Sequence, residues 1–206
     1  TKGQDSATAD LGSASKKGVP NMYEPMDLCE LAISLGSGFV ARSFSGDKEQ
    51  LVPLIKGAIK HQGFALIDCI SPCVTFNNNP DSTKSYEWVR DHKEATGTFD
   101  LVPPEQEITV QNPTSNKESV TLHDGTQIHL NRQSKDFDMR CRQSVLTALE
   151  EARQSQQVLT GLLHINSDSK DTHSIINTAK KPLNAMDEAD LCPGSEILEA
   201  INESLR

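Results

Sequence analysis

The spacing of apolar residues in the first third of the chain predicts two successive helix–strand units. Residues 26–36 carry a helical stripe that is expected to face inward, formed by Leu28, Leu31, Ala32 and Leu35. A strand is predicted at residues 39–44, and Cys29, one position off the stripe, is assigned a plain packing role. Short connections between alternating helices and strands are typical of parallel crossover units. The pattern therefore predicts an α/β fold, the closing half of a doubly wound domain.

The second unit consists of a helix at residues 47–62 and a strand from residue 64 to residue 70. Its predicted inward positions are Leu51, Leu54, Ile55, Ala58 and Ile59. Pro53 is costly inside a helix, so we expect the helix to begin late enough to place it in the first turn, or to kink there. The strand is a nearly continuous apolar run, which predicts a central position buried on both faces, with Cys69 packed in the interior.

Cys73 follows directly after this strand and after Pro72. Open parallel sheets bind ligands at the carboxyl edge of their strands, so Cys73 is the first candidate for chemistry. A lone cysteine is more often a small buried hydrophobe, and spacing alone favours that alternative. No serine–histidine–aspartate arrangement or phosphate-binding glycine loop has a workable context, so no catalytic residue is assigned.

The pattern changes after residue 80, which predicts a division into residues 1–80 and a C-terminal extension at 81–206. The extension begins with a polar helix at 84–96, and Asp124-Gly125 lies at the centre of a predicted β-hairpin at 120–130. His123 and His129 flank that turn and are expected to be surface residues rather than metal ligands. A helix follows at 140–157, with an inward stripe of Cys141, Val145, Ala148, Leu149 and Ala152, and then a strand at 158–165.

Composition excludes several classes of function. The net charge is −9, and the 20 basic residues are scattered, which argues against nucleic acid as a partner. No apolar run approaches the roughly 20 residues of a membrane helix, and the first residues lack a signal peptide, so a cytoplasmic location without membrane contact is expected. Five cysteines at irregular spacing favour reduced thiols or a metal ligand over disulfides.

Several separated segments resemble one enzyme family. Residues 36–78, GSGFVARSFSGDKEQLVPLIKGAIKHQGFALIDCISPCVTFNN, are similar to the later part of the thiamine-diphosphate-binding β subunit of the 2-oxoacid:ferredoxin oxidoreductases. The opening TKGQ resembles the segment that follows the cofactor signature in that family. VTLHDGTQIHL and VLTGLLHIN resemble its C-terminal extension. The matches occur in the right order, which makes the resemblance more specific than any single motif.

The resemblance implies site residues and cofactors. Thr1, Lys2, Gly3 and Gln4 correspond to the segment that wraps thiamine diphosphate and its Mg²⁺, and Cys73 corresponds to the fourth ligand of a [4Fe-4S] cluster. Lys2 stands where the pyruvate-using branch commonly has glycine, which favours 2-oxoglutarate, whose distal carboxylate an ammonium can pair with. The other cluster cysteines and the cofactor signature of the family are absent from this sequence, so we expect a fragment or one piece of a split subunit.

The function implied is a CoA-acylating oxidative decarboxylation of a 2-oxoacid, with electrons passed through the cluster to ferredoxin. The implied partners are the α subunit (or a fused α/γ subunit), ferredoxin, CoA and the 2-oxoacid, and the chain is expected to be inactive alone. The alternative is a non-catalytic interaction module derived from the same subunit. A different thiamine-dependent enzyme is disfavoured by the Pro72-Cys73 loop, because such enzymes need no cluster.

Overall fold

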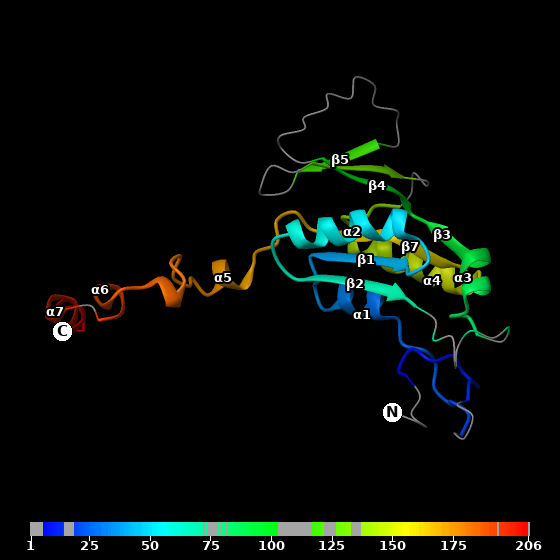
Figure 1. The fold of residues 1–206 in the computed structure, drawn as a ribbon, viewed down its shortest axis with the longest axis horizontal. Coiled ribbons are helices and arrows are strands. Elements are labelled where there is room, and N and C mark those ends of the chain that lie inside the picture. The colour runs from blue at the N-terminus through cyan, green and yellow to red at the C-terminus, as the bar shows by residue number, and fades with distance from the viewer. Residues whose placement is uncertain are drawn as a thin grey trace. The chain divides into compact units, whose positions relative to one another are not determined.

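The structure is a computed structural model that describes residues 6–14, 19–71, 73, 78, 80, 82–102, 117–121, 127–132, 137–192 and 194–205. It divides into two compact units, Thr1–Asp171 and Thr172–Arg206. The first unit contains the sheets and the core, and its elements are labelled in Figure 1. The division predicted at residue 80 stays a prediction, although strands from both sides of it join one sheet.

The main sheet has four strands in the order β2-β1-β7-β3. They are β1 (Phe39–Phe44), β2 (Ala65–Ile70), β7 (Val158–Ile165) and β3 (Lys93–Ala95). β1 and β2 are parallel, with Phe39 opposite Ala65 and Phe44 opposite Ile70. The helix between them makes this the crossover unit that the sequence predicts. β7 runs antiparallel to β1, and β3 runs parallel to β7, so the sheet is mixed.

The prediction that the apolar strand at residues 64–70 is central and buried on both faces is wrong. β2 lies at the edge of the described sheet, and most of its residues are only half-buried. Cys69 is exposed, contrary to its predicted packing role. The buried strands are β1 and β7. A continuous apolar run indicates a strand covered on two faces, but it does not say how many neighbours the strand pairs with.

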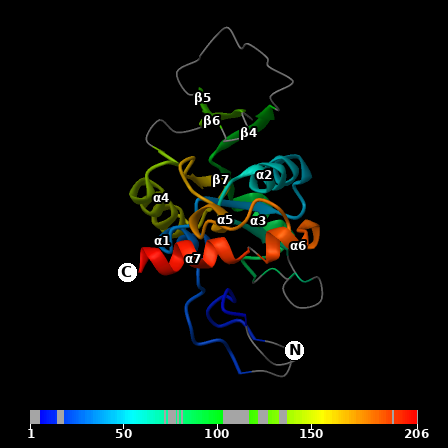
Figure 2. The ribbon, with the colours of Figure 1, turned by 90° about the vertical axis from the view of Figure 1, so that its left-hand side faces the viewer.

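Helices cover both faces of the sheet (Figures 1 and 2). Arg42 on β1 contacts Asp27 beside α1 (Leu28–Ser34), whereas the next residue, Ser43, contacts Gln50 of α2 (Lys48–Lys60). Successive residues of a strand point to opposite faces, so α1 and α2 lie on opposite sides. α4 (Arg142–Gln154) contacts α1 and β7 and shares the face of α1.

Of the inward face predicted for α1, only Ala32 is buried, and the prediction is wrong at the three leucines. The helix buries Cys29, Ala32 and Ile33, whereas Leu28, Leu31 and Leu35 are 36%, 42% and 80% exposed. Asp27 caps the helix by accepting hydrogen bonds from the backbone N–H groups of Cys29 and Glu30, at 2.8 and 3.0 Å. The packing role predicted for Cys29 is confirmed, because its side chain is fully buried.

α2 begins at Lys48, where Asp47 caps it, so Pro53 lies inside the helix and not in its first turn as one prediction had it. Leu54 and Gly57 are its buried residues, whereas Ile55 and Ile59, predicted to face inward, are exposed. A Cβ at Gly57 would lie 2.6 Å from the ring of Phe99. Glycine therefore lets a second sheet pack closely on this helix.

The second sheet has the order β4-β6-β5 and consists of β4 (Gly97–Val102), β5 (Lys117–Thr121) and β6 (Gln127–Arg132). β5 and β6 pair antiparallel, with Val120 opposite Ile128, which confirms the strands of the predicted hairpin. The Asp124-Gly125 turn and His123 lie outside the described residues, and only the backbone is described at His129.

The helices of the C-terminal half match the prediction only in part. The predicted helix at 84–96 ends early, as α3 (Tyr86–His92), and β3 follows it. On α4 the stripe Val145, Leu149 and Ala152 is buried as predicted, but Cys141 is exposed, because it precedes the helix. Val158–Ile165 is the predicted strand, β7.

The second unit contains α5 (Thr172–Ile175), a short 3₁₀ helix (Leu183–Ala185), α6 (Glu188–Leu191) and α7 (Ser195–Ser204). None of its described residues is buried. In the described part of the chain, no helix has both the length and the apolar character needed to cross a bilayer. The cytoplasmic location stays a prediction.

Candidate functional site

The carboxyl ends of β1 and β2 meet at one edge of the main sheet. The backbone N–H of Ser45, just after β1, donates to the carbonyl O of Ile70 at 2.9 Å. Cys73 follows three residues after Ile70 and is exposed. The structure therefore places Cys73 beyond the strand end, where the sequence predicts a ligand-binding thiol. Its role as a ligand stays a prediction.

Ser45 lies at the same edge. Its Oγ is buried and has no hydrogen-bond partner among the described residues. A buried hydroxyl without a hydrogen-bond partner costs free energy, and an acceptor that receives its hydrogen bond would remove that cost. The carboxyl edge of β1 and β2 therefore has one exposed thiol and one buried hydroxyl without a partner among the described residues.

A complete iron–sulfur cluster needs about four thiolate ligands. Among the described residues, no three metal-ligating side chains lie close enough together to hold a metal ion. The assignment of Cys73 as one cluster ligand, and the source of the other ligands, stay predictions. The residues predicted to bind thiamine diphosphate, Thr1, Lys2, Gly3 and Gln4, lie outside the described residues.

A buried ion cluster holds the two parallel strands together below this edge. Arg42 of β1 donates from Nη2 to Asp27 Oδ1 at 2.5 Å and from Nε to Asp68 Oδ2 of β2 at 2.9 Å. The Arg42 side chain is only 9% exposed. One guanidinium therefore joins the N-cap of α1, the central strand and the edge strand. The sign of this ion cluster in the sequence is small: Asp68 is the one polar residue in an otherwise apolar run.

The pKa values of the groups around Arg42 follow from burial and charge. Burial would raise the pKa of Asp27, but the charge and hydrogen bond of Arg42, with two backbone N–H groups, outweigh burial and lower it. Burial raises the pKa of the Cys29 thiol to about 12. Cys29 therefore stays protonated and acts as a packing residue. Partial burial, followed by the charge of Asp68, raises the pKa of Cys69.

A serine–histidine pair occurs at the opposite, amino edge of β1 and β2. Ser169 Oγ lies 2.9 Å from His61 Nε2 and 2.5 Å from the carbonyl O of Gln62. A hydroxyl has one proton, and here it goes to the carbonyl, so Ser169 accepts from His61. A serine nucleophile needs the opposite polarity. A Cβ at Gly38 would lie within 2.9 Å of both His61 and Ser169. The pair therefore packs tightly against the backbone at Gly38 and has a structural role.

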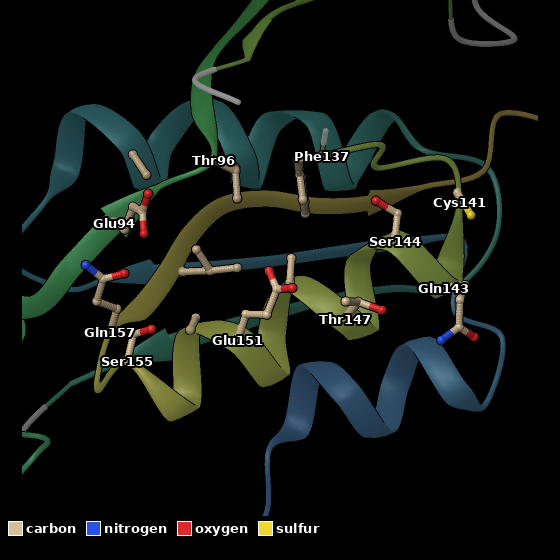
Figure 3. A pocket seen from close by; sticks show the side chains of 14 residues that line it. Glu94, Thr96, Phe137, Cys141, Gln143, Ser144, Thr147, Glu151, Ser155 and Gln157 are labelled. Carbon is tan, nitrogen blue, oxygen red and sulfur yellow. The ribbon is translucent and has the colours of Figure 1, made fainter. Parts of the chain in front are cut away.

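A groove of about 610 Å³ that the sequence analysis missed lies between α4 and the strands β3 and β7 (Figure 3). Ser144, Thr147 and Glu151 of α4 line one side, and Thr96 and Phe137 line the other. The available signal in the sequence was a set of short side chains on one side of α4, Ser144, Thr147 and Ala148, which line the groove. The groove offers hydroxyl, amide and carboxylate groups. Among its described residues, no three metal-ligating side chains lie close enough together to hold a metal ion.

Buried His164 gives the core a pH-dependent stability. Its Nδ1 lies 2.7 Å from the carbonyl O of Met139, and Nε2 has no partner among the described residues. Burial lowers its pKa, so below the unfolded-state value of 6.5 the unfolded chain binds more protons. We expect the free energy of unfolding to fall as the pH drops below that value, by at most about 1.4 kcal/mol per pH unit from this group.

Urea unfolding of the wild type and His164→Leu between pH 7.5 and 5.5 tests this expectation. The variant is destabilised at every pH because Met139 loses its partner, but its free energy of unfolding depends less steeply on pH. Equal pH slopes for the two proteins would contradict the assignment. His92→Leu, at a half-buried position where the ring stacks on Trp88, is the control and should leave the slope close to that of the wild type.

Comparisons with known proteins identify relatives of part of the chain. No protein-family model matches it. The β subunit of a 2-oxoacid:ferredoxin oxidoreductase from Sulfolobus sp is 47% identical over 79 residues, which are 38% of this chain and 26% of that protein. The 2-oxoglutarate synthase subunit KorB of Methanocaldococcus jannaschii is 39% identical over 77 residues, 37% of this chain and 28% of that protein. The matched region thus spans about a quarter of these relatives.

A solved structure supports the same fold. It is a 2-oxoglutarate:ferredoxin oxidoreductase from Magnetococcus marinus with 2-oxoglutarate, coenzyme A and succinyl-CoA bound. The likeness has a TM-score of 0.57 at 22% identity and covers 85% of this chain and 46% of that one. The predicted α/β fold is therefore confirmed. The resemblance found in the sequence is confirmed as well: over part of its length, this chain is similar to the β subunits of the 2-oxoacid:ferredoxin oxidoreductases.

Proposed function

We propose that this chain is the C-terminal section of the thiamine-diphosphate-binding β subunit of a 2-oxoacid:ferredoxin oxidoreductase. The observation that carries the proposal is the 47% identity to such a subunit over 79 residues. The position of Cys73, exposed beyond the end of β2, agrees with it. The activity proposed is the CoA-acylating oxidative decarboxylation of a 2-oxoacid, with electrons passed through a [4Fe-4S] cluster to ferredoxin.

Each cofactor would use a different segment of the chain. Bound thiamine diphosphate supplies the electron sink that decarboxylation requires, and the cluster removes electrons singly. Thr1, Lys2, Gly3 and Gln4 would hold the diphosphate with its Mg²⁺, because a glycine backbone approaches phosphate closely and hydroxyl and amide groups donate to its oxygens. Cys73 would give one thiolate to the cluster. The chain's task is therefore to hold and orient both groups.

The substrate proposed is 2-oxoglutarate rather than pyruvate. A Lys2 ammonium can pair with the distal carboxylate that 2-oxoglutarate has and 2-oxobutyrate lacks. KorB relatives are named as 2-oxoglutarate synthase subunits, and the solved relative has 2-oxoglutarate bound. The preference therefore rests on one side chain and on the names of its relatives.

The test uses the complete enzyme, assembled from this chain, the remainder of the β subunit and the α subunit. We expect brown absorbance and a reduction of ferredoxin that requires 2-oxoacid, CoA and thiamine diphosphate together. Lys2→Gly should raise the KM for 2-oxoglutarate by about tenfold, as expected for losing one charge-assisted contact, and leave the KM for 2-oxobutyrate nearly unchanged. Equal changes in the two KM values would remove the substrate assignment.

The same experiment separates the enzyme from the alternative, a non-catalytic interaction module. A module would assemble with the α subunit but would show neither cluster absorbance nor ferredoxin reduction. An assembled, colourless and inactive complex would therefore favour the module and contradict the proposed function.

A further inference from the structure

The amino-terminal loop, residues 6–14 and 19–26, contains no helix or strand, yet one buried side chain holds it in shape. Asn21 is 8% exposed, and its Nδ2 donates to the carbonyl oxygens of Ala9, Asp10 and Tyr23, at 3.0, 3.2 and 3.0 Å. Its backbone N–H donates to Ser13 O at 2.8 Å, and its carbonyl accepts from the N–H of Gly12 at 2.7 Å. The loop is therefore fixed internally.

Asp10 connects this loop to a second segment, residues 83 and 84. Its Oδ2 accepts from the backbone N–H of Thr83 at 3.0 Å, and its Oδ1 accepts from Thr83 Oγ1 at 2.6 Å and from Lys84 Nζ at 3.3 Å. The carboxylate is 18% exposed. Three donors, one of them charged, make this a strong local connection between segments more than 70 residues apart in the sequence.

The second segment belongs to the carboxyl edge of the sheet. Tyr86, two residues after Lys84, packs its ring edge-on against Phe44 at the end of β1, with centroids 5.3 Å apart. The backbone N–H of Tyr86 donates to Asn78 Oδ1 at 3.1 Å. Residues 83 and 84 are therefore anchored beside the strand ends that precede Cys73, and the amino-terminal loop lies next to them (Figure 1).

We propose that Asp10 is a positioning residue that fixes the amino-terminal loop, residues 6–14 and 19–26, against the carboxyl edge of the sheet. Gln4 precedes Asp10 by six residues, a tether that reaches at most about 20 Å. Under the proposed function, a loop already fixed at Asp10 lowers the ordering cost of binding the cofactor that the preceding segment, Thr1 to Gln4, is proposed to hold. This inference rests on the proposed function, because that function gives both segments a cofactor to hold.

The test compares Asp10→Ala with the wild type in the complete enzyme. We expect the apparent KM for thiamine diphosphate to rise about tenfold, while kcat at saturating cofactor stays within about twofold, because the cofactor must then order the loop itself. Hydrogen exchange at the Thr83 amide should be about tenfold faster, since that N–H loses its acceptor. Iron content should not change. Asp10→Asn, which retains one acceptor oxygen, should fall between the two proteins.

Glu24→Gln is the matched control, because it removes an exposed carboxylate from the same loop. It should leave the KM, kcat and Thr83 exchange at wild-type values. Faster exchange in Asp10→Ala with an unchanged KM for thiamine diphosphate would overturn the positioning role. A lower kcat together with a lower melting temperature, at an unchanged KM, would overturn it as well. A wild-type enzyme that binds no thiamine diphosphate would instead refute the proposed function, and this inference with it.

Discussion

Cys73→Ser in the complete enzyme is expected to remove most of the iron of the proposed [4Fe-4S] cluster, about four atoms per site. Ferredoxin reduction should be lost with it. A serine hydroxyl is a much weaker ligand for this kind of cluster than a thiolate, and the three remaining ligands would leave one iron without a protein donor. The exposed position of Cys73 means that the substitution disturbs no packed core of this chain. The measurement is iron per assembled enzyme, together with the visible absorbance.

Substitution of other exposed thiols tests whether the assignment is specific to Cys73. Cys69 and Cys192 are also exposed, so Cys69→Ser and Cys192→Ser test whether any accessible thiol matters. Both variants should keep the wild-type iron content. Full iron content in Cys73→Ser, or an equal loss in Cys69→Ser, would remove Cys73 as the ligand while leaving the sequence relationship intact.

The order and type of the elements could be predicted from the sequence because they depend on local spacing. The strands at 39–44 and 158–165, the crossover to β2 and the hairpin at 120–130 all follow from apolar periodicity and turn residues. The position of Cys73 beyond a strand end follows from the same reasoning. Each of these features depends on residues that are close together in the sequence; the longest, the crossover, spans residues 39–70.

Features that depend on which element packs against which could not be predicted in the same way. The three leucines of the predicted stripe on α1 are exposed, whereas the helix buries a face made of Cys29, Ala32 and Ile33. Two of these side chains are small, which allows close contact with the sheet. The position of β2 at an edge depends on β7, which lies about ninety residues further along the chain. Tertiary contacts between distant segments decided both outcomes.

The ion cluster at Arg42 is the strongest example, and it leads to the largest expected change in stability. Arg42→Met keeps most of the buried side-chain volume but leaves Asp27 and Asp68 without their cation, at 28% and 22% exposure. Removing one partner of a buried pair costs about 3 kcal/mol of the free energy of unfolding, because a charge stays desolvated and unpaired. Urea unfolding at pH 7 measures the loss. Arg153→Met, at an exposed ion pair with Glu150, is the matched control and should cost no more than about 0.5 kcal/mol.

The dependence of this loss on pH has a definite sign. In the wild type the pKa of Asp27 is lowered, so its contribution to stability is present above the ordinary value of 3.8 and is lost as the pH falls through the folded-state pKa. Without Arg42, only the two backbone N–H groups still oppose burial, so the pKa of Asp27 rises above its wild-type value and protonation relieves the unpaired charge at a higher pH. The stability gap between wild type and Arg42→Met should therefore narrow from pH 7 to pH 4. A gap that is constant across this range would mean that lost packing, rather than unpaired charge, destabilises the variant.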